Sequence, residues 1–220
     1  MTVFIIDTET NGAEKPEVIE LAYAEPGKAA AVARFRPQVP STWGALAVHH
    51  ILPEDLEFCI PSTEAKLPPC QYIIGHNVDY DWDALGKPPV KRICTLAIAR
   101  FLYPTLESHK LGALYYMLRG ATEQTRSALR DAHSAAADVY FCEFILRRML
   151  EEHRPELADA PTEELWAFSE DCRLPRIISF GKYKGTPINK LPGDYVAWMH
   201  RQPDMDPYVI AALKKFRGGR

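Results

Sequence analysis

The strongest constraint on how this chain folds is a short apolar segment near its amino terminus that runs into two acidic residues. Residues 3–6 (VFII) are continuously apolar and mostly β-branched, which indicates a strand buried on both faces rather than a helix. Asp7 and Glu9 flank Thr8, and the twofold periodicity of a strand puts both carboxylates on one face. Two such charges repel and raise each other's pKa unless a cation lies between them. An isolated pair is more often a solvated strand end, so further motifs must decide for or against a metal site.

The order of the expected elements indicates an α/β protein. Strands come first and helices follow, as in a layer of helices packed on a central sheet. The first three strands are joined by short turns and suggest an antiparallel meander. Strands are expected at residues 3–6, 18–24, 30–35 and 72–74, and helices at 81–85, 95–102, 111–118 and 132–150.

Composition divides the chain into a large acidic part and a small basic one. Residues 173–220 hold ten Lys and Arg against three Asp and Glu, whereas residues 1–172 hold sixteen against twenty-six, for a net charge of −3. An acidic catalytic part needs cations in its site and a basic surface elsewhere to hold phosphate. We expect a main domain at 1–152, a connector at 153–175 with a short helix at 162–170, and an α+β module at 176–220 that begins with a strand at 176–180.

A second acidic motif, HNVDYD at residues 76–81, directly follows the strand expected at 72–74. A carboxylate at a strand-to-helix junction can turn back toward the sheet and join a cation site. Asp79 or Asp81 could equally serve as the N-cap of the following helix. Taken alone, the motif favours neither interpretation.

The third motif is DAHSAAAD at residues 131–138, where a run of small residues allows a helix to approach a sheet closely. The five-residue gap between His133 and Asp138 does not put both on one stripe of a helix. His133 is therefore expected at or before the first turn. Considered alone, a histidine of this kind is more often a surface or capping residue than a catalytic one.

Together the three motifs meet the needs of phosphodiester hydrolysis, which requires an activated water and neutralised charge in the transition state. Two Mg²⁺ ions about 3.5 to 4 Å apart supply both, and carboxylate oxygens suit that metal. A histidine with a pKa near neutrality can accept the proton of the attacking water. Four carboxylates from separate segments are enough to hold two such ions: Asp7, Glu9, Asp81 and Asp138.

The segments FIIDTETNG, IELA, GHNVDYD and HSAAAD resemble the motifs of the DEDD superfamily of 3′-to-5′ exonucleases, in the subgroup with histidine in the third motif. The resemblance implies a ribonuclease H-like fold, Mg²⁺ or Mn²⁺ with two ions per active site, and His133 as general base. It implies Asp7, Glu9, Asp81 and Asp138 as metal ligands. The element AVHHI at residues 47–51 is similar to one in the family and matches His49. Nucleic-acid contacts are expected from Thr8, Thr10, His49 and Asn77.

The basic module makes the resemblance more specific. Its residues 179–199 resemble the tail of one exodeoxyribonuclease subfamily, which is linked to DNA repair and recombination; their sequence is SFGKYKGTPINKLPGDYVAWM. Lys182 and Lys184 flank Tyr183 between two glycines, a layout that can present cations to phosphate and a ring to a base. Lysines that merely solvate a small packing domain are the alternative. We expect this module to hold duplex or flanking DNA while the acidic site takes the 3′ end.

Two other functions compete with a DNA exonuclease that acts on 3′ ends in DNA repair or recombination. The motifs do not separate DNA from RNA, because discrimination depends on contacts around the 2′ position. An exonuclease that trims RNA 3′ ends is therefore the first alternative. The second is a non-catalytic module that binds nucleic acid or a polymerase, which ranks lower because no motif carboxylate has been lost.

The remaining features favour a protein of the cytosol that does not associate with a membrane. The sequence begins without a basic, apolar leader. Five scattered cysteines without a C-x-x-C pair indicate reduced thiols rather than a disulfide framework or a zinc site.

Overall fold

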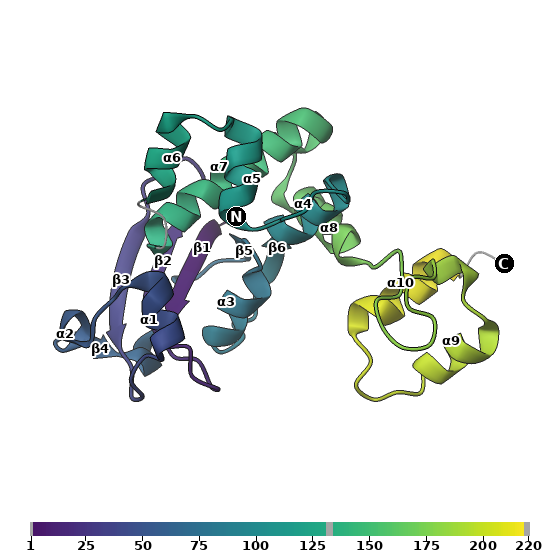
Figure 1. Cartoon of the computed structure of the whole chain (residues 1–220), viewed down its shortest axis with the longest axis horizontal. Coiled ribbons are helices and arrows are strands. Elements are labelled where there is room, and N and C mark those ends of the chain that lie inside the picture. Colours follow the sequence, from purple (N-terminus) through teal and green to yellow (C-terminus); the bar gives the residue numbers. More distant parts are fainter. Residues whose placement is uncertain (1, 131–133, 218–220) are drawn as a thin grey trace. The chain divides into compact units, whose positions relative to one another are not determined.

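The computed structural model describes residues 2–130 and 134–217, which fall into two compact units, Met1–Ser169 and Glu170–Arg220. The first unit contains a mixed six-stranded sheet in the order β4-β3-β2-β1-β5-β6 (Figure 1). β1 pairs antiparallel with β2 and parallel with β5, so it is the central strand at which the sheet changes direction. The strands are β1 (Val3–Thr10), β2 (Val18–Ala24), β3 (Ala31–Arg36), β4 (Ile60–Pro61), β5 (Tyr72–Gly75) and β6 (Lys91–Cys94).

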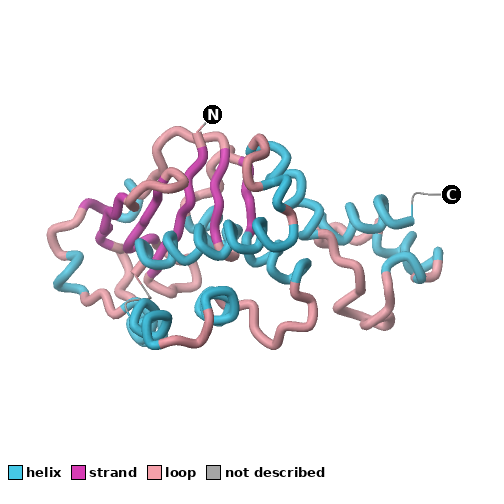
Figure 2. Tube along the Cα trace, turned by 90° about the horizontal axis from the view of Figure 1, so that it is seen from above, coloured by secondary structure: helices cyan, strands magenta, loops and turns pink. Residues whose placement is uncertain are grey.

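Helices pack on this sheet, as the expected α/β class requires (Figure 2). The long helix α7 lies against β1, β2 and β3, while α3 packs against β1, β5 and β6. The helices of the first unit are α1 (Trp43–His49), α2 (Pro53–Leu56), α3 (Val78–Ala84), α4 (Thr95–Leu102), α5 (Leu111–Arg119), α6 (Glu123–Arg130) and α7 (Ala135–His153), with single 3₁₀ turns at η1 (Ser62–Glu64) and η2 (Pro155–Leu157).

Helix α8 (Thr162–Arg173) lies in the segment expected to be a connector, and its first part packs on the sheet unit. Glu163 accepts hydrogen bonds from Lys91 and from the hydroxyl of Tyr72. The Ser169 hydroxyl accepts a hydrogen bond of 2.8 Å from the backbone N–H of Cys94. These bonds tie α8 to the start of β5 and to the edge strand β6.

The second unit has a small hydrophobic core of its own, centred on Ile178, Leu191, Met199 and Leu213. Its elements are η3 (Ile188–Lys190), α9 (Gly193–Met199) and α10 (Pro207–Arg217). The strand predicted at residues 176–180 is wrong, because this segment makes only an isolated bridge between Ile177 and Pro187. Pro187 lacks an N–H group and cannot extend a ladder beyond that bridge.

None of the helices within residues 2–130 and 134–217 combines the length and apolar character needed to cross a bilayer. The five cysteines are free thiols, and Cys94 and Cys142 are buried.

Candidate active site

The two faces of β1 serve different purposes. Phe4 and Ile6 belong to a hydrophobic cluster that includes Val78 of α3. Because side chains alternate along a strand, Asp7 and Glu9 lie on the other face, the one that carries Ile5. The pairing of β1 with β2 shifts register between Glu9 and Thr10, which marks a bulge directly after the second acid. A bulge at this point can re-aim the side chains at the end of the strand.

Helix α7 brings a third carboxylate to β1. Ser134 caps its amino terminus by accepting a hydrogen bond of 3.3 Å from the N–H of Ala137. Asp138 lies in the first helical turn, where the positive end of the helix dipole favours a negative charge. The fully buried Ala135 shows why this segment needs small residues, since larger ones would hold the helix start away from the sheet.

Asp7, Glu9 and Asp138 form a cluster in which one carboxylate oxygen from each residue lies within 4.8 Å of the others. Burial, reinforced by the neighbouring carboxylates, raises the pKa of Asp7 well above its ordinary value. Burial, followed by the charges of Asp138 and Glu20, raises the pKa of Glu9 to about 8. Oxygen donors at this spacing and with this repulsion fit a hard divalent cation such as Mg²⁺ or Mn²⁺.

Asp81 is buried, with 4% of its surface exposed, and is anchored to β1 through one of its oxygens. Its Oδ1 accepts hydrogen bonds from the backbone N–H of Thr8, at 2.9 Å, and from the hydroxyl of Thr8, at 2.7 Å. Burial raises the pKa of Asp81 to about 6, and the two bonds from Thr8 oppose that rise. The negative charge of Asp81 also raises the pKa of Asp7, so it faces the same acidic site.

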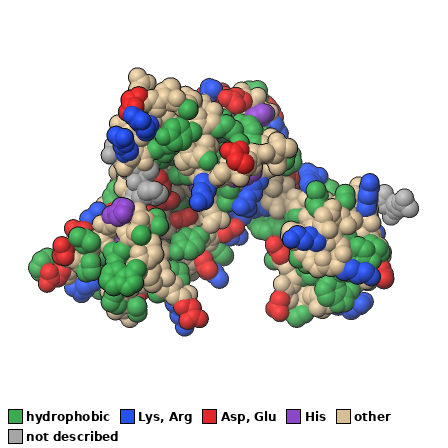
Figure 3. All heavy atoms as spheres, viewed as in Figure 1, with side chains coloured by type: hydrophobic (Ala, Val, Ile, Leu, Met, Phe, Trp, Pro, Cys, Tyr) green, Lys and Arg blue, Asp and Glu red, His purple; other side chains and the backbone are tan. Residues whose placement is uncertain are grey.

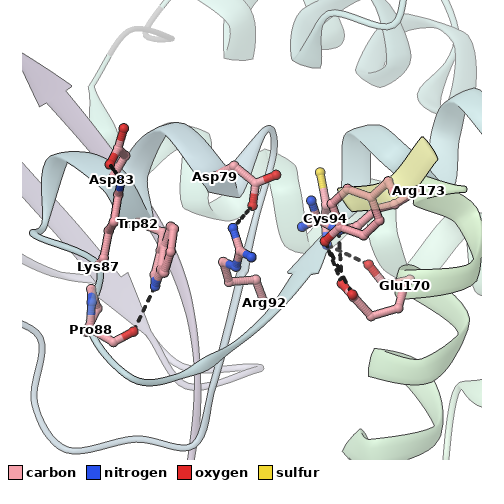
Figure 4. Close-up of polar contacts among 11 residues, drawn as sticks. Asp79, Trp82, Asp83, Lys87, Pro88, Arg92, Cys94, Glu170 and Arg173 are labelled. Atoms are coloured by element: carbon pink, nitrogen blue, oxygen red, sulfur yellow. Dashed lines mark hydrogen bonds and ion pairs between the residues drawn. The ribbon is translucent and has the colours of Figure 1, made fainter. Parts of the chain in front are cut away.

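The structure also separates the two acids of the second motif, either of which could have been the N-cap of the helix. Asp79 forms an ion pair with Arg92 on β6, and Figure 4 shows its carboxylate directed toward that guanidinium. Asp81, two residues later on α3, bonds to Thr8 instead. Asn77, not either acid, occupies the N-cap position, in a left-handed conformation and without a side-chain cap bond.

Glu20, in the segment IELA, is a residue of the site to which the sequence motifs assigned no role. It is 3% exposed and lies opposite Glu9 in the β1–β2 register. Its Oε1 accepts a hydrogen bond of 3.1 Å from the N–H of Ala135, and its Oε2 accepts one of 2.8 Å from Arg34. Glu20 thus fixes the start of α7 against β2. The signal was available, because an acid in the middle of an apolar strand calls for a buried partner.

His49 ends helix α1, close to the strand that carries the acids. Thr42 caps this helix, and its N–H bonds at 2.8 Å to the carbonyl of Asn11. His49 is 5% exposed, and its Nδ1 accepts a hydrogen bond of 2.9 Å from Ile51. Burial lowers the pKa of His49, which favours the neutral ring. Because Nδ1 of that ring accepts a hydrogen bond, the proton lies on Nε2. Within the described part of the chain, that Nε2 has no hydrogen-bond partner.

The remaining candidate residues lie in three settings. The hydroxyl of Thr10 bonds at 2.6 Å to that of Tyr80. Asn77 lines an open polar pocket of about 570 Å³ together with Arg100, Ser108 and Lys110. His133 lies outside the described residues. Lys182 and Lys184 belong to the second unit.

We expect Thr8→Val to lower turnover about tenfold at neutral pH. Removing the hydroxyl takes away one hydrogen bond to a charged carboxylate, worth about 1.5–3 kcal/mol. The pKa of Asp81 then rises further, so the defect grows as pH falls and shrinks at higher pH. Turnover measured against pH checks this, with Thr8→Ser as the control that keeps the hydroxyl. A Thr8→Val enzyme with the wild-type pH profile would contradict the assigned role of this bond.

A mixed six-stranded sheet with helices packed on it is the ribonuclease H-like fold of known exonucleases. The chain has the fold of a solved structure described as exonuclease X in complex with 5′ overhanging duplex DNA, with a TM-score of 0.58 and 22% identity. That match covers 76% of this chain and 99% of the other. A structure of E. coli exonuclease I with a dT13 oligonucleotide matches with a TM-score of 0.53 and 16% identity, over 71% of this chain and 42% of the other.

Among curated proteins, exodeoxyribonuclease 10 of Escherichia coli K12 is 27% identical over 224 residues, which is 96% of this chain and 97% of that protein. The chain is therefore similar to this exodeoxyribonuclease over nearly its whole length, and the resemblance to exonucleases of this kind is confirmed. A family model described as "Putative quorum-sensing-regulated virulence factor" matches residues 174–204, within the second unit.

Proposed function

We propose that this protein is a 3′-to-5′ exodeoxyribonuclease that releases 5′-mononucleotides from DNA 3′ ends, in DNA repair or recombination. The observation that carries the proposal is the cluster of Asp7, Glu9 and Asp138, with oxygens within 4.8 Å of one another beside the buried Asp81. The homologue that matches nearly the whole chain is an exodeoxyribonuclease, and one solved relative is bound to duplex DNA.

Asp7, Glu9, Asp81 and Asp138 would hold Mg²⁺ or Mn²⁺, two ions per active site. When bound, such ions neutralise charge on the phosphate and lower the pKa of water. The chain positions these ligands through Thr8, which orients Asp81, and through Glu20, which fixes the start of α7. Because the pKa values of Asp7 and Glu9 are raised, both acids bind protons more readily than free carboxyl groups do, and protons would compete with a cation for them. His133, just before α7 in the sequence, would accept the proton of the attacking water.

Several groups around the cluster suit the sugar and phosphate of a substrate strand. The buried Nε2–H of His49 is a donor without a partner among the described residues, which favours a bond to substrate. The pocket beside Asn77 offers the cations Arg100 and Lys110 for backbone phosphates. Thr8 and Thr10, which flank Glu9 at the end of the central strand β1, would contact the terminal nucleotide.

End-labelled digestion tests this function directly. With Mg²⁺, 5′-labelled single- or double-stranded DNA should shorten one nucleotide at a time, and 3′-labelled DNA should release its label as a mononucleotide at once. Matched RNA should be degraded at least ~10-fold more slowly. Faster degradation of RNA would make the protein a 3′-end trimming ribonuclease instead. Stepwise shortening of 3′-labelled DNA would reverse the proposed polarity.

A further inference from the structure

Three aromatic rings in the second unit form a column that begins at the core and ends in solvent. Tyr183 and Tyr195 pack against the module core, and their ring centroids are 4.6 Å apart. Trp198, one helical turn further along α9, stacks on Tyr195 at 5.3 Å with an interplanar angle of 20°. Its side chain remains 42% exposed. The outer end of the column is therefore a flat indole surface that is held in place from behind.

The turn that carries Lys182 and Lys184 is built against the same column. Gly181 has φ +63°, and a Cβ at this position would come within 2.7 Å of the Tyr195 hydroxyl oxygen. Glycine is favoured here, since a side chain would be strained at this φ and would displace the Tyr195 hydroxyl. The N–H of Lys184 bonds to the carbonyl of Gly181 and closes the turn. The Lys182 ammonium lies 5.4 Å from the Tyr183 ring centroid, so the cations and the rings share one surface.

In the part of the chain that the structure describes, the two lysines of this surface are not neutralised by neighbouring acids, as several cations of the first unit are. Lys87, Lys91 and Arg92 each form an ion pair with a nearby acid. Among the described residues, neither Lys182 nor Lys184 forms one, and both are exposed. Figure 3 shows Lys and Arg side chains spread over the visible face of the second unit, with hydrophobic side chains exposed among them. Unneutralised cations beside an exposed ring complement a polyanion that carries flat bases.

We propose that this surface, made of Lys182, Lys184, Tyr183, Tyr195 and Trp198, binds an unpaired stretch of a nucleic-acid strand. One base stacks on the outer face of Trp198, and the neighbouring phosphates lie against the two lysines. An unpaired strand is favoured over duplex, because the bases of a duplex are already stacked and cannot cover the indole. The inference rests on the proposed function for its choice of DNA. A tethered strand-binding module would raise the local concentration of substrate at the site.

Equilibrium binding in EDTA separates this surface from catalysis, because no strand is cut. Fluorescence anisotropy of the full-length protein with a labelled 20-nucleotide single strand should show Trp198→Ala binding roughly 5- to 150-fold more weakly, the range that corresponds to one stacked base. Trp198→Phe keeps a ring and should stay within about threefold of wild type. Affinity for a blunt 20-base-pair duplex should change less than about twofold in Trp198→Ala.

Replacing the two lysines gives an independent test. The quantity measured is the dependence of single-strand affinity on salt concentration. Lys182→Ala/Lys184→Ala should reduce the slope of log affinity against log salt by about 1.4, since each phosphate contact contributes about 0.7. Lys28→Ala/Lys66→Ala, which removes two exposed cations of the first unit, should leave the slope unchanged. These lysines lie outside the core, so this test holds even if Trp198→Ala fails to fold.

Single-strand affinity that is unaltered by Trp198→Ala in a folded protein would overturn the proposal. An equal loss of single-strand and duplex affinity would overturn it as well. Failure of the proposed function would show itself differently, as an absence of digestion in Mg²⁺ while single-strand binding in EDTA remains intact.

Discussion

Asp7→Asn is expected to lower the turnover of DNA by about 10³-fold or more while the protein stays folded. The substitution keeps the shape of the side chain but removes a carboxylate from the cluster with Glu9 and Asp138. Transition-state stabilisation by a bound metal is worth several kcal/mol, and about 4 kcal/mol corresponds to 10³ in rate. Single-turnover rates with Mg²⁺ and a 5′-labelled strand measure the loss.

Stability distinguishes loss of the metal site from loss of the fold. The pKa of Asp7 is raised by burial and by its acidic neighbours, so a neutral amide should leave the metal-free protein at least as stable as wild type. The stabilisation by Mg²⁺ should be largely lost. Asp79→Asn is the matched control, because Asp79 pairs with Arg92 rather than with the cluster, and its turnover should stay within about threefold of wild type. Wild-type turnover in Asp7→Asn would show that the site is wrongly assigned.

Removal of divalent metal by EDTA is expected to abolish turnover and to change how stability depends on pH. In the metal-free protein the pKa of Glu9 is about 8, above its ordinary value of 4.5. The folded state therefore holds a proton that the unfolded state has released between these two values. The stability contributed by the protonated form is complete below pH 4.5 and is lost as pH rises through about 8. Without metal, the free energy of unfolding should fall across this window.

Bound metal should oppose the fall in the free energy of unfolding with pH, because a cation binds the deprotonated carboxylates. At pH 5.5, Mg²⁺ should stabilise the protein little. At pH 8.5, Mg²⁺ at a hundredfold excess over its Kd should add about 2.7 kcal/mol, or roughly 5–10 °C in Tm for a chain of this size. Thermal unfolding at several pH values, with EDTA or Mg²⁺, measures both effects. Unfolding curves that respond to pH identically with and without Mg²⁺ would argue against a metal site formed by these acids.

The sequence predicted the central elements of the fold well because their signals are local. The apolar run of β1 and the helical pattern of α4 identify their own structure, and α4 spans the predicted residues 95–102. β6 escaped prediction because KRIC contains two cations, whose ion pairs with Glu163 and Asp79 only the folded chain reveals. β4 is only two residues long, too short to show any alternation.

The candidate site was predictable as a set of residue types but not as a set of contacts. Spacing along a strand put Asp7 and Glu9 on one face, and the structure adds Asp138 to them. Asp81 was expected at the site from the motif, but its two hydrogen bonds from Thr8, 73 residues away, could not be read from the motif. The apolar strand around Glu20 indicated that this acid needs a partner, but the partner itself, Ala135, lies 115 residues away.

The hydrogen bond between Glu20 and Ala135 affects when the acidic site can form while the protein is synthesised on the ribosome. Asp7 and Glu9 are synthesised early, but they cannot meet Asp138 until the start of α7 has emerged and docked on β2. Contacts at such long separation form late, after the cost of closing the intervening chain has been met. A nascent or partly unfolded chain therefore presents scattered acids with no competent site. Long-range assembly confines hydrolysis of nucleic acid to molecules that have completed folding.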